Sequence, residues 1–111
     1  MCDLFGIKSD DLVRVSLELE QTLNISFVLH DSIHRGGDYY YYRLRDPMEV
    51  EIILQRNEEM PGEVAEPGCT DCPIILYVCM INHEELIRIR HQVLNAMKNN
   101  IILVREDKSS S

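Results

Sequence analysis

The 111-residue sequence contains no apolar run close to the roughly 20 residues that a membrane-spanning helix needs, and its first residues lack the basic region of a signal peptide. It contains no glycine-rich phosphate-binding loop, no nucleophile elbow and no paired-histidine metal motif. Internal repeats and low-complexity tracts are also absent. We therefore expect a cytoplasmic protein with no membrane partner, no cofactor and no enzymatic activity.

Basic residues are scarce, since 19 Asp and Glu stand against 11 Lys and Arg and give a formal net charge of -8. This charge repels nucleic acid and anionic lipid, so we expect neither as a partner. A basic protein is the natural complement. The alternative is that the acidity only maintains solubility.

The rest of the composition is that of an ordinary globular domain, with 45% apolar and 27% charged residues. The length is typical of one domain with one hydrophobic core. We expect a single domain over residues 1–107 and a frayed tail over 108–111.

The apolar spacing predicts two helices and five strands. A helix should begin at Ser9 and end near Asn24, because Ser9 can cap it and Leu12, Val15 and Leu19 recur at helical spacing. Strands are predicted at 25–31, 39–45, 48–56, 74–81 and 101–105, and a second helix from Asn82 to Lys98. In the first strand, Ile25, Phe27 and Leu29 share one side.

These elements predict an α+β single domain in the order α-β-β-β-β-α-β. Its sheet should be a mixed, mostly antiparallel five-stranded sheet with the apolar strand 74–81 in the middle. The final strand, helix and strand should form a right-handed crossover with parallel strands, unless the last strand inserts elsewhere.

The four cysteines are Cys2, Cys69, Cys72 and Cys79. In a reducing compartment we expect free thiols or a metal site instead of disulfide bonds.

The Cys69 and Cys72 pair has zinc-site or redox spacing, but it is half of a zinc motif. The possible further ligands are Cys79, His83 and His91. A redox pair usually begins a helix, whereas Pro73 and a strand follow here. We assign no metal, and Cys69 and Cys72 remain the metal candidates.

His30, Asp31 and His34 could suggest an acid-base cluster. Neighbours on a strand point to opposite faces, so His30 and Asp31 should diverge, and we assign no catalytic residue.

Two features favour protein binding. Among Tyr39 to Tyr42, alternation sends two rings into the core and two, Tyr39 and Tyr41, to the opposite face, where they suit an interface unless a helix covers them. The connection 57–73 contains acidic residues and no basic residue, and a loop this long is usually functional or disordered. Its candidate binding residues are Glu58, Glu59, Glu63, Glu66 and Asp71.

The segments 35–42, 49–57 and 74–78, joined by this acidic loop, resemble small immunity proteins of bacterial contact-dependent growth inhibition and polymorphic-toxin systems. The resemblance implies a cytosolic protein that binds the toxin domain of a cognate effector and blocks its active site. It implies that the toxin is a nuclease, with a ribonuclease as the first candidate. An acidic surface of this protein would then cover the basic cleft of the toxin. The alternatives are a regulatory or scaffold binding module and a small zinc protein.

Overall fold

The computed structural model describes residues 2–32, 35, 37–46, 48–58 and 64–106. The elements in this part of the chain are β1 Cys2–Ile7, α1 Leu12–Leu23, β2 Val28–Ser32, β3 Gly37–Leu44, β4 Val50–Arg56, β5 Ile74–Met80, α2 His83–Met97 and β6 Ile101–Arg105. A 3-10 turn at Pro67–Cys69 lies between β4 and β5, and a second at Lys98–Asn100 follows α2. The predicted α+β class is confirmed, and the tail predicted at 108–111 lies outside the described residues.

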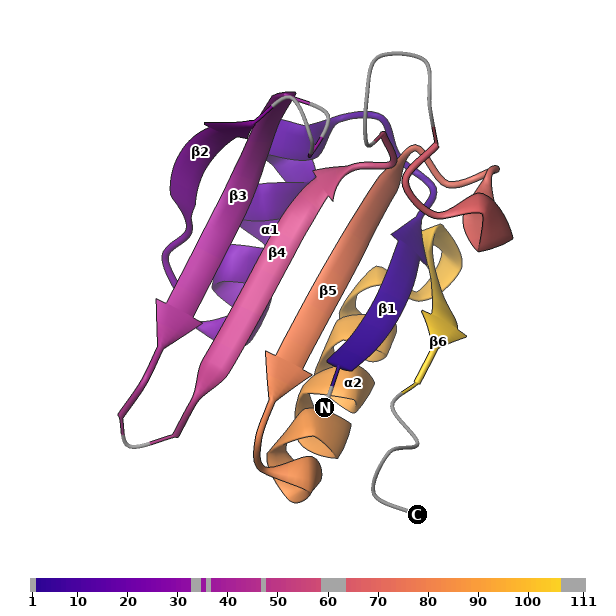
Figure 1. Ribbon diagram of the computed structural model, residues 1–111. Coiled ribbons are helices and arrows are strands. Elements are labelled where there is room, and N and C mark those ends of the chain that lie inside the picture. The colour runs from indigo at the N-terminus through magenta and orange to yellow at the C-terminus, as the bar shows by residue number, and fades with distance from the viewer. Residues whose placement is uncertain (1, 33–34, 36, 47, 59–63, 107–111) are drawn as a thin grey trace.

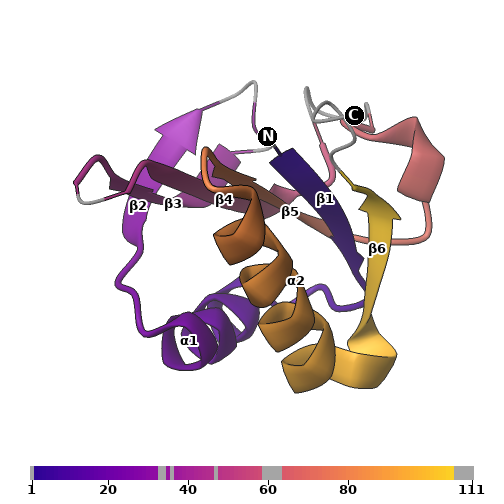
Figure 2. The same cartoon turned by 90° about the horizontal axis from the view of Figure 1, so that it is seen from below.

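One sheet contains all six described strands in the order β2-β3-β4-β5-β1-β6, and every neighbouring pair is antiparallel. Both helices pack on the same face of this sheet (Figures 1 and 2). The opposite side of the sheet, which no described helix covers, is termed the open face. Neither described helix has the length and apolar character needed to cross a lipid bilayer.

The prediction of five strands was wrong, because β1 was missed. β1 lies between β5 and β6, so these two strands are parallel to each other but not adjacent. Five of the six β1 residues are buried, because α2 covers one side of the strand and the 57–73 loop the other. A strand buried on both sides is recognised by a continuous apolar run, and in β1 the buried Asp3 and the small Gly6 interrupt that run.

The first predicted helix was placed correctly but begins later than expected. Its N-cap is Asp11, whose Oδ1 accepts a hydrogen bond from the Arg14 N–H at 3.1 Å, and not Ser9. Its C-cap is Asn24 in the left-handed conformation, which Asn tolerates better than most residues. Leu12, Val15 and Leu19 are buried as their spacing predicts.

The second helix confirms its predicted cap and inner face. Asn82 Oδ1 accepts a hydrogen bond from the Glu85 N–H at 3.0 Å, and Glu84 and Glu85 occupy the first turn, where the helix dipole favours negative charge. The stripe of Leu86, Ile89, Val93 and Met97 is buried against the sheet.

The first predicted strand was placed too early, because β2 begins at Val28. Ile25 and Phe27 precede the strand and are partly buried against the core. Leu29 is 56% exposed, because β2 forms the edge of the sheet.

Candidate partner-binding face

The strand register orders the side chains of the open face into rows, since directly opposed residues point to the same side of a sheet. The three rows are Arg43, Glu51, Cys79 and Cys2; Val28, Tyr41, Ile53, Tyr77 and Leu4; and His30, Tyr39, Gln55, Ile75 and Gly6. Each row crosses the sheet from its β2–β3 side to β1. The rows place residues that are distant in sequence beside one another.

The loop between β4 and β5 covers one side of this face. Cys69 and Cys72 form a small second core with Leu4 and Ile75 of the open face. The described part of the loop therefore shields the β5–β1–β6 side of the face and leaves the β2–β3 side uncovered, where His30 and Arg43 are exposed. Between the two sides, Ile53 and Gln55 of β4 are buried.

The buried side chain of Asn57 holds the loop in place. Its Nδ2 donates to the carbonyl oxygens of Cys69 at 3.0 Å and Cys72 at 3.1 Å, and its Oδ1 accepts from the Glu66 N–H at 2.8 Å. A single amide thus satisfies the Glu66 N–H and the Cys72 carbonyl, and it adds a second donor to the Cys69 carbonyl, which also accepts from the Cys72 N–H at 3.0 Å. This part of the 57–73 connection is an ordered element of the fold.

Cys69 and Cys72 are free thiols with packing roles. A Cβ at Gly6 would lie 2.6 Å from the Cys72 sulfur, so β1 needs glycine there to let the loop approach. Burial raises the pKa of both thiols, which disfavours the reactive thiolate. Among the described residues, no group of three His, Cys, Asp or Glu side chains converges as a metal site would require.

The expectation that all four cysteines are free thiols or metal ligands was wrong for one pair. Cys2 and Cys79 lie opposite each other on β1 and β5, and a disulfide joins them, with Cα atoms 4.0 Å apart. The prediction failed because β1, the strand that carries Cys2 to Cys79, was not recognised.

The uncovered side of the open face carries an aromatic cluster. The His30 ring stacks on Tyr39 with centroids 5.5 Å apart and meets Tyr41 edge-on at 5.5 Å. The Arg35 guanidinium lies 5.5 Å from the centre of the Tyr39 ring, and its Nη1 donates to Gln55 Oε1 at 2.8 Å. Tyr40 and Tyr42 pack into the core on the helix side, so the predicted division of the tyrosines is confirmed, and neither described helix covers the outer pair.

A polar network adjoins this cluster. Tyr41 donates its hydroxyl proton to Glu51 Oε2 at 2.7 Å, and Arg43 Nη2 lies 3.5 Å from Glu49 Oε1. The hydrogen bond to Glu51 raises the pKa of Tyr41, so the phenol stays protonated and remains a donor. His30, Tyr39, Tyr41, Arg43, Glu49 and Glu51 are together termed the docking face.

The predicted acidic binding residues differ in their surroundings. Glu58 and Asp71 are exposed, and Glu59 and Glu63 lie outside the described residues. The Glu66 side chain is only 19% exposed, accepts a hydrogen bond from the Tyr77 hydroxyl at 2.7 Å and lies 3.6 Å from Arg105. Glu66 therefore has internal partners, and its assignment to partner binding from charge alone overlooked them.

The histidine and aspartate considered for catalysis lie on different sides of β2, as alternation predicts. His30 lies opposite Tyr39 on the open face, and Asp31 lies opposite Asp38. His34 lies outside the described residues.

Sequence reasoning missed Glu49 and Glu51 as candidate binding residues. The signal was present, because both alternate with Val50 and Ile52 and so share the side of the strand opposite the core.

No protein-family model, no curated protein and no solved structure matches the chain.

Proposed function

We propose that this chain is an immunity protein that neutralises a cognate toxin domain by binding it through the docking face. The observation that supports this most is a sheet face with two outward tyrosines, a histidine and two carboxylates, and no described helix over them. Tyrosines supply broad contact area with few rotamers to freeze, and they are enriched where interfaces gain most of their affinity. We place this activity in the cytoplasm.

The charge of the chain supports a basic partner. A net charge of -8 opposes nucleic acid as a ligand, whereas a nuclease active-site cleft is basic because it binds phosphates. The carboxylates of the docking face, with Glu58 and Asp71 of the exposed loop, could occupy such a cleft as the phosphates of its substrate do. The proposed target is therefore a nuclease toxin, and a ribonuclease is the first candidate.

The first experiment tests whether the two proteins bind. The adjacent genes are screened for a toxin-type protein, its C-terminal domain is produced, capture of that domain by this protein is measured, and growth arrest by the toxin is scored with and without co-expression. We expect capture and rescue of growth. A toxin domain that is neither captured nor inhibited would refute the proposed function.

The second experiment tests whether the docking face and the loop contribute different steps, by measuring association and dissociation rates. We expect Tyr39→Ala to speed dissociation by roughly tenfold or more, because a buried aromatic contact sets residence time. The matched control Gln21→Ala lies at an exposed position of α1, on the far side of the sheet, and should leave both rates unchanged.

Glu58→Lys combined with Asp71→Lys should slow association and reduce its salt dependence, because long-range charge mainly steers encounter. If the tyrosine variant and the loop variant both change the same rate constant, the assignment of dissociation to the docking face and of association to the loop would be wrong.

A further inference from the structure

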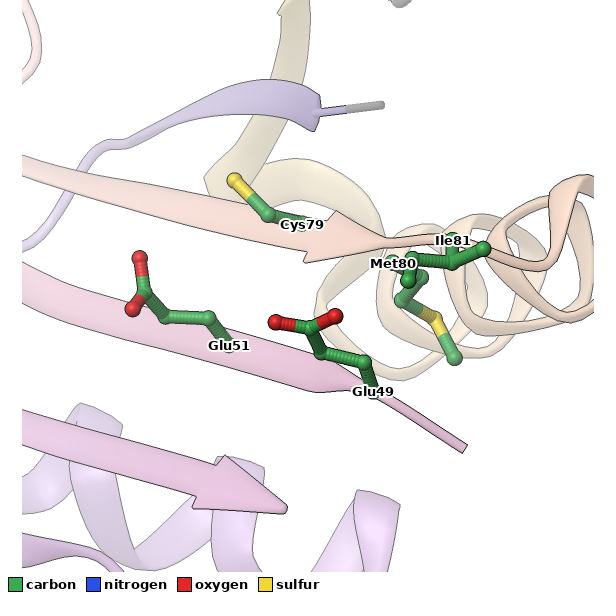
Figure 3. Close-up of a pocket in the computed structure, with 5 residues that line it drawn as sticks. All are labelled: Glu49, Glu51, Cys79, Met80 and Ile81. Carbon is green, nitrogen blue, oxygen red and sulfur yellow. The ribbon is translucent and has the colours of Figure 1, made fainter. Parts of the chain in front are cut away.

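A pocket of about 210 Å³ opens beside the aromatic cluster, where β4 and β5 lie side by side (Figure 3). Its lining residues are Glu49, Glu51, Cys79, Met80 and Ile81. Glu49 and Glu51 rise from the same side of β4 toward β5 (Figure 3). The backbone N–H of Ile81 donates to the Glu49 carbonyl at 3.5 Å, so the strand pairing continues to the pocket wall.

The pocket combines two kinds of surface. The carboxylates of Glu49 and Glu51 provide negative charge, while Ile81, which is 65% exposed, provides an apolar wall. At this exposure most of the Ile81 side chain is available for contact with a partner. Lysine and arginine match such a pocket, because each has an apolar stem that packs on hydrocarbon and a charged head that pairs with carboxylate.

The chain itself already brings a guanidinium to this site. Arg43 Nη2 lies 3.5 Å from Glu49 Oε1, with the two side chains 40% and 48% exposed. A contact this exposed contributes little to stability, so an incoming cation could replace it at small cost. Glu51 is held differently, since the Tyr41 hydroxyl fixes its Oε2 at 2.7 Å and so orients the carboxylate.

We propose that this pocket receives a lysine or arginine side chain of the toxin domain. The charged head lies between Glu49 and Glu51, and its alkyl stem lies against Ile81. Arg43 gives up its contact with Glu49 when the partner residue enters. This inference rests on the proposed function, because it names the chemistry that the basic partner brings to the docking face.

The test uses a small probe, so that it does not depend on the toxin. N-acetyl-arginine amide is titrated into the 15N-labelled protein, with the neutral N-acetyl-norleucine amide as control. We expect the arginine probe to shift the amide signals of residues 49–51 and 79–81 in a saturable manner, with a dissociation constant in the millimolar range. The norleucine probe should leave these signals in place.

The variant Glu49→Gln/Glu51→Gln should weaken the arginine probe by about fivefold or more, which corresponds to about 1 kcal/mol. The matched control is Asp10→Asn/Glu18→Gln, which changes the net charge by the same amount at exposed residues of the helix side. This control should leave binding within about twofold of the parent protein. Ile81→Ser keeps both carboxylates and should also weaken the probe.

Equal weakening by the two charge variants, or shifts centred away from the pocket, would overturn the inference. Thermal unfolding of each variant shows whether a loss of binding reflects a loss of folding, and Ile81→Ser provides an independent result if the double variant is unstable. Capture of the toxin without probe binding would refute the pocket and leave the proposed function standing. Probe binding without toxin capture would refute the proposed function and leave the affinity of the pocket for arginine standing.

Discussion

The strongest stability prediction concerns the ion pair that ties α2 to β1. Asp3 is fully buried, and Arg90, whose side chain is 15% exposed, donates to it twice, from Nε at 2.8 Å and from Nη2 at 3.0 Å. Each hydrogen bond to a charged partner contributes about 1.5–3 kcal/mol, so two of them account for about 3–6 kcal/mol. Arg90→Met would leave a buried carboxylate without its guanidinium, and we expect a loss of about 3–5 kcal/mol in the free energy of unfolding.

Equilibrium urea denaturation followed by far-UV circular dichroism measures this loss. The matched control is Arg88→Met on the same helix, where the guanidinium pairs with Glu85 but is 55% exposed, and we expect it to cost less than about 1 kcal/mol. The double variant Asp3→Leu/Arg90→Met should recover most of the stability, because it removes the buried carboxylate together with the guanidinium, and Glu106, the other carboxylate beside Arg90, is 43% exposed and hydrated. Equal losses in Arg90→Met and Arg88→Met, at an unchanged denaturant slope, would show that the pair is not effectively buried.

Three further predictions concern the loop anchor Asn57, the Cys2–Cys79 disulfide bond and Tyr77. Asn57→Ala should lower the free energy of unfolding by about 3 kcal/mol and speed hydrogen exchange at the Glu66 amide, because the Glu66 N–H and the Cys72 carbonyl lose the side chain that pairs them. Alkylation in denaturant should label two cysteines without reductant and four after reduction. Opening the Cys2–Cys79 bond, whose cysteines are 77 residues apart, should lower the free energy of unfolding by up to about 4.5 kcal/mol, measured by denaturation of the reduced protein. Burial, followed by the hydrogen bond to Glu66, raises the pKa of Tyr77 far above its usual value near 10, so a spectrophotometric titration should show a tyrosine that ionises only well above pH 10 and is missing in Tyr77→Phe. Because the folded state holds this proton more tightly, Tyr77 adds stability below pH 10 that is lost as the pH rises further, and Tyr77→Phe should make stability above pH 10 less dependent on pH.

The thiol count also bears on the compartment. A reducing cytoplasm keeps most protein disulfides open, so protein isolated from cells with its thiols trapped should carry four free cysteines if it acts there. Two trapped thiols would instead favour an oxidising location and count against the cytoplasmic part of the proposal.

The elements that the sequence predicted correctly are those whose local pattern matches their final environment. In α2, Asn82 and Glu85 lie at cap spacing, and Leu86 and Ile89 recur along one face that the sheet then buries. The strand 74–80 is apolar throughout because it is covered on both faces. In such segments, a few neighbouring residues contain the information that determines the structure.

The features that were missed depend on partners far away in the chain. β1 contains the buried charge of Asp3 and the small Gly6, which weaken a strand prediction, and both are explained only by Arg90 and by Cys72. The Cys2–Cys79 bond follows from β1 and was lost with it. In the sequence, Glu66 cannot be distinguished from the other carboxylates of its loop, because its partners Tyr77 and Arg105 lie on other strands.

The arrangement of the open face separates stability from binding. The loop and its anchor Asn57 complete a second core on the β5–β1–β6 side, whereas His30 and Tyr39 lie on β2 and β3, on the side that the described part of the loop leaves uncovered. Changes at the exposed residues of the docking face, His30, Arg43 and Glu49, remove few buried contacts, so they should alter partner affinity while costing less than about 1 kcal/mol of folding free energy. The two sides share one rigid sheet, so destabilising the loop should affect binding only as far as it unfolds the sheet. Stability and affinity measured on both sets of variants should therefore vary independently, and a shared loss in every variant would show that the docking face depends on the loop.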